Sequence, residues 1–261
     1  MGSGCLTLKV IIMAQVQNTL PADTQCDHCA VRHKSVCGAL SADELIRLNK
    51  IASTRKMEAG ETILSDEVDV TFFANIVSGV VKLTKMLPDG RQQLIGLQFP
   101  SDFLGRAYGK ANPYFAEAVT DVELCCFKQD PFEELLQDYP ALERRLFENT
   151  LDELDAAREW LLLLGRKSAV EKVASFLLML VRRASLVGCA RFNPGSSAVI
   201  ELPLGRADIA DFLGLTIETV SRQFAALKAE GAVDFRDSRH CEIVDSALLS
   251  SLAGQDRPTL D

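Results

Sequence analysis

The sequence predicts an α+β protein built as a jelly-roll-like β-roll, a long helix and a C-terminal winged helix-turn-helix. Three observations predict this order. Short apolar runs punctuated by glycine fill residues 54–127, helix-forming residues run without a break through 141–165, and a helix–glycine–helix pattern follows residue 204. The expected parts are an N-terminal arm with a cysteine cluster (1–40), the roll as sensor domain (41–140), the dimerisation helix (141–166) and the winged helix-turn-helix domain (167–261).

Composition narrows the class of protein. The apolar run CLTLKVIIMA contains Lys9 and is too short to span a bilayer, so we expect no membrane segment and a cytoplasmic location. We interpret this run as a tag remnant or an upstream start, with Met13 as an alternative initiator. The 8 cysteines are unevenly spaced for a disulfide scaffold, and a reducing compartment favours metal or redox roles for them.

Charge is distributed unevenly along the chain. The net charge is −8, yet residues 166–245 hold 11 Lys and Arg against 10 Asp and Glu. The C-terminal part is therefore close to neutral while the remainder is acidic, which leaves room for a local basic face that binds nucleic acid.

The arm carries a dense group of soft ligands in the stretch TQCDHCAVRHKSVCGAL. Cys26, Cys29 and Cys37 form a closed zinc site if His28 or His33 is the fourth ligand, and the same cysteines suit an iron–sulfur cluster. Taken alone, this stretch leaves zinc and iron–sulfur open.

The roll is expected to begin after a short capped helix. Ser41 and Glu44 have the spacing of a capping box, in which each side chain binds the other's backbone N–H. Turn signals then separate the strands at Gly60, Gly79, Asp89-Gly90 and Pro100.

Apolar residues in the long helix recur at alternating steps of three and four, the period of a coiled-coil seam that joins two copies. This predicted seam consists of Phe147, Thr150, Leu154, Ala157, Leu161 and Leu164. A second apolar set, Leu146, Leu151, Trp160 and Leu162, lies off the seam and can face the roll. The alternative is an amphipathic helix that lies on the roll without a partner.

The C-terminal domain begins with a predicted helix at 168–184. In LGRADIADFLGLTIETVSRQFAALKAEG, Ala210, Gly214 and Val220 have the spacing of a helix-turn-helix, in which a glycine forms the tight turn. Thr216 is expected to cap the second helix, which stops at Gly231. The segment AVDFRDSRHCEIV then predicts a β-hairpin wing.

The first turns of the second helix would face base edges in a DNA major groove. Thr216 and Thr219 lie there. Arg222 can donate to guanine, Glu218 can accept from cytosine, and Ser221 can bind a base or a phosphate. Glu218 and Arg222 are four residues apart and are expected to pair when DNA is absent. The alternative is an ordinary salt bridge on a solvated helix. We find no general base near an open metal position, so we expect no enzyme.

The order of roll, long helix and LGLTIETVSR resembles the cyclic-AMP receptor and fumarate-nitrate-reduction regulator superfamily of bacterial transcription factors. The cysteine-rich head resembles the oxygen-sensing fumarate-nitrate-reduction type of α-proteobacteria, and the resemblance covers Cys26 to about Ala253. It implies a 4Fe–4S cluster on three N-terminal cysteines and one central cysteine, a homodimer, a TTGAT-type palindromic DNA site read by Glu218, Ser221 and Arg222, and RNA polymerase as a further partner.

Four cysteines are candidates for the central ligand: Cys125, Cys126, Cys189 and Cys241. Strand alternation places Cys126 in the core and turns Cys125 outward, where the arm can reach it. The family pattern agrees, because its central cysteine follows the position of Phe115 by ten residues and precedes that of Pro140 by fifteen.

The expected ligands are therefore Cys26, Cys29, Cys37 and Cys125, and this fourth ligand favours iron–sulfur over zinc. One departure from the family is the spacing between Cys29 and Cys37, which enclose seven residues rather than five.

We expect no cyclic nucleotide in the roll. The cyclic-AMP branch holds the phosphate with a Gly-Glu turn and an arginine. Here no glutamate follows Gly105, the segment FAEA takes the place of the arginine, Glu117 is expected to repel an anion, and Arg106 sits at the wrong end. All three histidines (His28, His33 and His240) lie outside the roll, which argues against haem.

The resulting hypothesis is a linkage between metal binding and dimerisation. With the cluster bound at low oxygen, the arm is held near the long helix, two chains pair, and both recognition helices meet a palindrome. Oxygen degrades the cluster and DNA is released. The alternative is a DNA-binding regulator of the same family whose cysteines hold a structural zinc or form a redox-thiol trigger.

Overall fold

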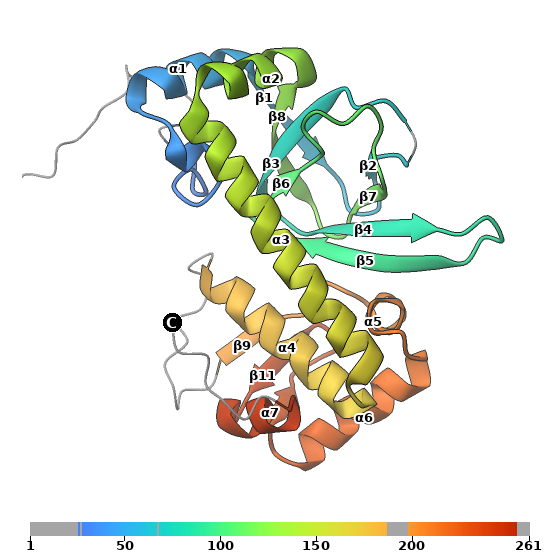
Figure 1. The fold of residues 1–261 in the computed structure, drawn as a ribbon. Helices are drawn as coiled ribbons and strands as arrows, with labels where there is room; N and C mark the ends of the chain where they lie inside the picture. The colour runs from blue at the N-terminus through green and yellow to red at the C-terminus, as the bar shows by residue number, and fades with distance from the viewer. Residues whose placement is uncertain (1–25, 27, 67, 187–197, 255–261) are drawn as a thin grey trace, which may run out of the picture.

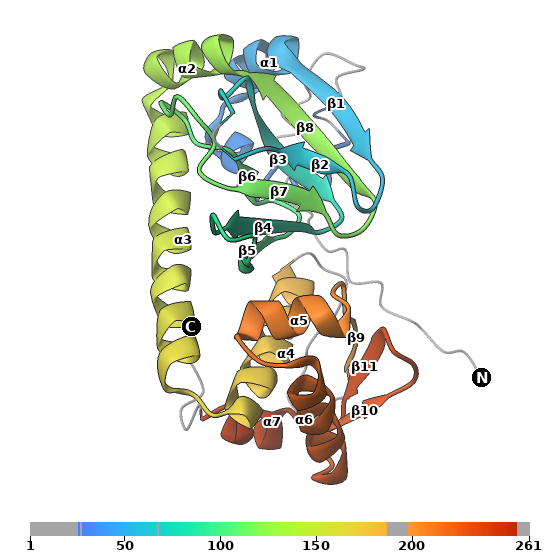
Figure 2. The ribbon, with the colours of Figure 1, turned by 90° about the vertical axis from the view of Figure 1, so that its right-hand side faces the viewer.

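The computed structural model describes residues 26, 28–66, 68–186 and 198–254 and confirms the predicted α+β architecture (Figure 1). The roll lies at one end, the winged helix-turn-helix at the other, and helix α3 (Pro140–Arg166) runs along one side of both (Figure 2). None of the described helices has the length and apolar character needed to cross a membrane.

The arm ends in a 3-10 turn, η1 (Val36–Ala39), and α1 (Ala42–Ile51) follows it. Ser41 caps α1 with the predicted capping box, because its hydroxyl accepts from the Glu44 N–H and the Glu44 carboxylate accepts from the Ser41 N–H. Gly60, Gly79 and Gly90 adopt positive φ angles, which confirms three of the predicted turns.

Within the described residues the roll consists of two four-stranded sheets, ordered β1-β8-β3-β6 and β2-β7-β4-β5. The strands are β1 (Ala52–Met57), β2 (Thr62–Leu64), β3 (Phe72–Ser78), β4 (Val81–Met86), β5 (Gln92–Gln98), β6 (Phe103–Leu104), β7 (Phe115–Ala118) and β8 (Val122–Lys128).

A second apolar layer lies outside the first sheet. Helix α2 (Gln129–Asp138), which the sequence analysis missed, places Phe132 against this face. The Phe132 ring lies with its centroid 5.4, 5.5 and 5.1 Å from those of Phe73, Phe103 and Phe127. Because the same layer includes Val36 and Cys37 from the arm, these aromatic rings attach the arm to the roll.

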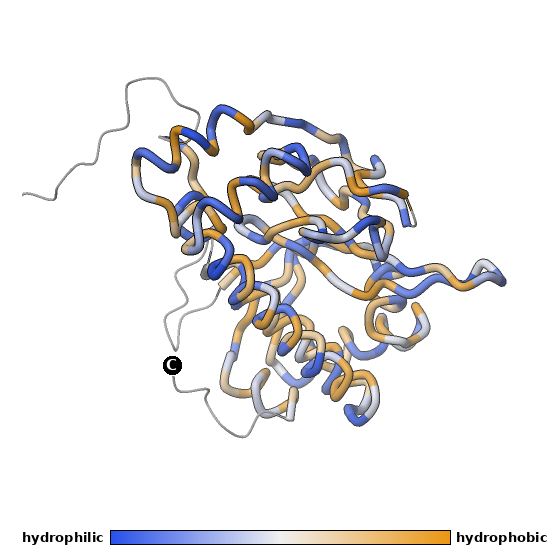
Figure 3. Tube along the Cα trace, turned by 45° about the horizontal axis from the view of Figure 1, so that its top comes forward, coloured by the Kyte–Doolittle hydropathy of each residue, from blue (hydrophilic) through white to orange (hydrophobic). Residues whose placement is uncertain are grey.

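Helix α3 confirms the predicted long helix to within one residue at each end. Hydrophobic residues recur along its whole length (Figure 3). The prediction for the second apolar set is partly wrong: Leu146 and Trp160 pack inward, but Leu151 and Leu162 remain 43% and 61% exposed. These two side chains lie on the face of α3 that is turned away from the domains of its own chain.

The C-terminal domain contains the predicted helices and wing plus two elements that were not predicted, β9 and α7. Its three strands have the order β10-β11-β9. The elements are α4 (Ala169–Leu186), β9 (Ala198–Glu201), α5 (Arg206–Leu213), α6 (Ile217–Ala229), β10 (Val233–Phe235), β11 (His240–Ile243) and α7 (Ser246–Leu252).

The helix-turn-helix has the predicted internal contacts. Ala210 and Val220 are buried where α5 and α6 meet, and Gly214 ends α5 in the left-handed conformation at φ 60°. Thr216 caps α6 by accepting from the Thr219 N–H, and Gly231 follows the helix at φ 81°.

The two domains share one apolar core. Leu94, Leu97 and Phe99 of the roll belong to the same buried cluster as the C-terminal domain. Polar contacts reinforce this junction: Arg183 of α4 pairs with Asp102 of the roll at 2.9 Å. The helix-turn-helix domain therefore packs directly against the roll within one chain.

Replacing Gly214 with alanine should lower the free energy of unfolding by roughly 1–2 kcal/mol, the cost of a left-handed residue with a side chain. Strain at φ is the cause rather than crowding, since an added Cβ would meet only Leu164 Cδ2 at 3.8 Å. Urea denaturation of the purified variant measures the change.

The matched control is Gly165→Ala, because Gly165 lies within α3 with open space around it. This variant should be as stable as the parent protein or gain up to about 1 kcal/mol from helix propensity. A Gly214→Ala protein that unfolds at the parent urea concentration would contradict the role of the turn.

Candidate functional site

Two of the four candidates for the central ligand, Cys125 and Cys126, lie on opposite faces of β8. Cys241 is buried in β11 of the wing, and Cys189 lies outside the described residues. Cys126 is 3% exposed and packs between the two sheets, as predicted. Cys125 faces the other side, away from the space between the sheets, and meets the arm there as predicted. That face is covered by the arm, α1 and α2, so Cys125 is half buried and packs with the same apolar layer as Cys26 and Cys37.

The four predicted ligand thiols lie near one another. Burial raises the pKa of the Cys125 thiol, and the neighbouring Cys37, Cys26 and Cys29 raise it further. Burial also raises the pKa of Cys37 to about 11, although hydrogen bonds from Ser35 and Asn75 oppose the shift. Because a metal binds the thiolate form, binding a metal at two thiols with raised pKa would release protons.

Two amide side chains contact the thiols. Asn75 of β3 is 2% exposed, and its Nδ2 donates to Cys37 Sγ at 3.2 Å. Asn49 of α1 accepts from Cys26 Sγ at 3.3 Å. The sequence analysis missed both residues. A polar residue inside the apolar strand segment FFANIV was the available signal for Asn75.

The histidines of the arm lie at the surface. His28 and His33 are exposed, and the His33 ring contacts the Arg32 guanidinium. Among the described side chains, no three His, Cys, Asp or Glu groups already enclose a single ion. The four thiols are therefore neighbours rather than a preassembled ligand set.

The arm contacts the start of α3 directly. Val36 is fully buried in one cluster with Leu142 of α3. Arg145, one turn further along α3, donates to the Lys34 carbonyl at 3.3 Å. The end of the arm that carries Cys37 thus packs directly on the first turns of this helix.

The predicted seam of α3 is largely open to solvent. Phe147, Leu154 and Leu161 are 61%, 44% and 70% exposed, and Thr150 and Ala157 are exposed as well. Leu164 differs, because it is half buried and packs with the C-terminal core.

The recognition helix presents the predicted side chains to solvent. Thr216, Glu218, Ser221 and Arg222 are exposed, and Thr219 is half buried. The predicted pair between Glu218 and Arg222 is wrong: Arg222 Nη2 donates to Thr219 Oγ1 at 3.1 Å.

The Glu218 carboxylate has other partners. Hydrogen bonds from its own backbone N–H and from the Thr216 hydroxyl hold its pKa below the ordinary value, and Arg222 adds a smaller effect of charge. The nearby threonine hydroxyls compete successfully with a pairing that spacing alone allows.

A cavity of about 670 Å³ lies between the roll and α3. Arg106 and Arg144 line it together with Glu143 and Glu153. Glu117 does not line this cavity and pairs with Lys82 on the neighbouring strand at 2.8 Å.

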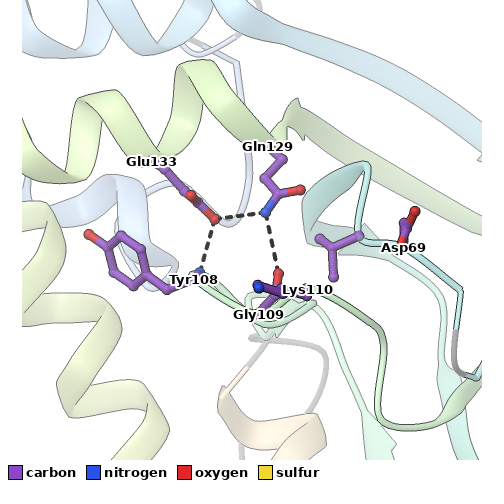
Figure 4. Close-up of a pocket in the computed structure, with 7 residues that line it drawn as sticks. Asp69, Tyr108, Gly109, Lys110, Gln129 and Glu133 are labelled. Atoms are coloured by element: carbon purple, nitrogen blue, oxygen red, sulfur yellow. Dashed lines mark hydrogen bonds between the residues drawn. The ribbon is translucent and has the colours of Figure 1, made fainter.

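A smaller hollow lies where the loop after β6 meets α2 (Figure 4). Its polar groups already bind one another: Glu133 accepts from the Tyr108 N–H and from Gln129 Nε2, which also donates to the Gly109 carbonyl. This network holds the loop against the helix, and we assign no ligand to it.

Comparisons with known proteins agree with this architecture. Residues 54–139 match the model of the cyclic nucleotide-binding domain, and residues 171–252 match that of the Crp-like helix-turn-helix domain. The chain is 44% identical over 232 residues to the transcriptional activator protein FnrL of Cereibacter sphaeroides, covering 89% of this chain and 93% of the relative.

A probable transcriptional activator of Rhizobium leguminosarum bv. viciae is 46% identical over 220 residues, which cover 84% of this chain and 89% of the relative. The solved structure of FixK2 from Bradyrhizobium japonicum has a TM-score of 0.70 at 31% identity, covering 80% of this chain and 100% of that one. These relatives are regulators rather than enzymes, and they share the roll, the helix-turn-helix and the fold. The chain therefore belongs to the CRP/FNR family of DNA-binding transcription regulators.

Proposed function

We propose that this regulator senses oxygen through a 4Fe–4S cluster held by Cys26, Cys29, Cys37 and Cys125. The observation that carries the proposal is the closeness of the arm thiols to Cys125 of β8, beside the start of α3. Four cysteine thiolates are the usual ligands of such a cluster, and the buried N–H donor at Cys37 suits a thiolate. When bound, the cluster supplies a cross-link that oxygen destroys.

The arm converts this cross-link into a change at α3. Burial of Val36 against Leu142 and the hydrogen bond from Arg145 to the Lys34 carbonyl depend on the position of the arm. Ligation of Cys37 and Cys125 together holds the arm in this position. The free energy of cluster binding thereby stabilises the start of the helix.

The exposed apolar face of α3 is where a second copy of the chain binds. Phe147, Leu154 and Leu161 lie seven residues apart and would form the centre of a parallel seam. Small gains in helix order matter, because a dimer forms only when the free energy gained at the interface exceeds the entropic cost of association.

At its far end α3 reaches the DNA-binding domain. The Trp160 ring stacks on Phe212 of α5, with centroids 4.0 Å apart and an interplanar angle of 22°. Pairing of two α3 helices at low oxygen therefore positions two α6 helices for a TTGAT-type palindrome. The further partner of the DNA-bound dimer is RNA polymerase, in the cytoplasm. We assign no cyclic nucleotide to the cavity, since Glu143 and Glu153 oppose a buried phosphate.

The choice of ligand on β8 is testable by serine substitution. Cys125→Ser should lose the visible absorbance of the anaerobic protein and its operator binding, because three thiolates remain for four irons. Absorbance spectra and gel-shift titrations under nitrogen measure both effects.

Cys126→Ser is the matched control, since this thiol lies between the sheets on the opposite face of the same strand. It should keep the absorbance and the operator binding. The reverse outcome, with absorbance lost only in Cys126→Ser, would overturn the ligand assignment.

The seam is testable at its most exposed leucine. Leu161→Glu should weaken dimerisation of the anaerobic protein by at least about 1.5–3 kcal/mol, the value of burying one leucine side chain. Sedimentation equilibrium measures the change. Leu162→Glu, an exposed leucine off the seam, should have a clearly smaller effect, and equal effects would refute the predicted seam.

The recognition helix is testable at Arg222. Arg222→Ala should cost roughly 1–3 kcal/mol of binding to the palindrome while affinity for scrambled DNA changes far less, because a base contact is lost. Fluorescence anisotropy at one fixed salt concentration measures both. Arg91→Ala, in the hairpin after β4, is the control arginine and should bind as the parent does. Unchanged binding of Arg222→Ala to both DNAs would remove Arg222 from the reading set.

A further inference from the structure

Asn75 is a buried polar residue on the cysteine-bearing face of the roll. Its neighbours Ala74 and Ile76 are fully buried between the two sheets, so strand alternation turns Asn75 to the side that holds Cys125. In the antiparallel register Asn75 lies directly opposite Cys125 on β8. Side chains in such a pair are close neighbours.

The amide of Asn75 has one satisfied and one unsatisfied end. Its Nδ2 donates to Cys37 Sγ at 3.2 Å. Its Oδ1 is buried without a hydrogen-bond partner among the described residues. A buried unpaired acceptor is unfavourable, so an apolar side chain of equal size would serve the stability of the roll better. Unlike an apolar side chain, Asn75 can donate a hydrogen bond to the Cys37 sulfur.

We propose that Asn75 is a positioning residue of the metal centre, whose N–H donates to the Cys37 thiolate and sets how readily the bound cluster is oxidised. This inference rests on the proposed function, because it requires the cluster at Cys37. Hydrogen bonds to the sulfur ligands are one of the factors that set the potential of an iron–sulfur centre.

The direction of the effect follows from charge. An N–H donor stabilises negative charge on the thiolate, and the reduced cluster carries more negative charge than the oxidised one. Loss of the donor should therefore lower the reduction potential and make the cluster easier to oxidise. Mutation of a residue that hydrogen-bonds a metal ligand typically lowers metal affinity or activity by roughly 10–100-fold.

The experiment compares two variants that lack the donor and differ in volume, Asn75→Leu and Asn75→Ala, with the parent protein. The control is Asn112→Leu. Asn112 is also buried in the roll, donates to the Val68 carbonyl at 3.2 Å and has an unpaired Oδ1, but it contacts none of the thiols in the described structure. Each protein is reconstituted anaerobically with iron and sulfide, and its metal content, midpoint potential and rate of bleaching in air are measured.

Both Asn75 variants should take up iron and sulfide, show a lower midpoint potential than the parent, and bleach roughly tenfold faster in air, whereas Asn112→Leu should match the parent. Agreement between the leucine and alanine variants separates loss of the donor from a change in volume.

Two results would overturn the inference. Loaded Asn75 variants with the parent potential and bleaching rate would show that the donor has no such role while the proposed function stands. A parent protein that takes up no iron and sulfide would refute the proposed function, and this inference with it.

Discussion

The structure depends on one buried contact, the insertion of the end of the arm into the aromatic layer outside the first sheet. Val36 and Cys37 lie there against Phe132, which in turn packs on three other phenylalanine rings. The same layer contains Leu142 at the start of α3, so the arm, the roll and the helix share one cluster. This contact sets the position of the end of the arm relative to Cys125 and packs it directly against α3.

Helix α3 connects the arm cluster to the C-terminal domain. Its first turns pack in the arm cluster, its middle leaves an apolar face exposed, and its last turns pack through Trp160 on Phe212 of the helix-turn-helix. The roll and the C-terminal domain also share an apolar core within one chain. In the proposed dimer two such chains would join at α3, which suits the fixed spacing of two half-sites on DNA.

Local patterns in the sequence predicted what local interactions determine. The helix-turn-helix was readable because Gly214, Thr216 and Val220 act through neighbours a few residues away. Helix α2 was missed because it follows β8 directly and its N-cap, Lys128, makes no side-chain capping bond, although Asp130 and Pro131 in its first turn are a start signal. The covered face of Cys125, the contact of Asn75 with Cys37 and the hydrogen bond from Arg222 to Thr219 depend on tertiary packing or on competition between partners, which spacing cannot resolve.

The central claim is that the four thiols hold an iron–sulfur cluster rather than a single ion. The most direct measurement is the iron, zinc and acid-labile sulfide content of the full chain purified without oxygen. Our account predicts about four irons and four sulfides per chain, since each iron of the cube takes one of the four cysteines. About one zinc per chain with no sulfide, in a colourless protein, would contradict it.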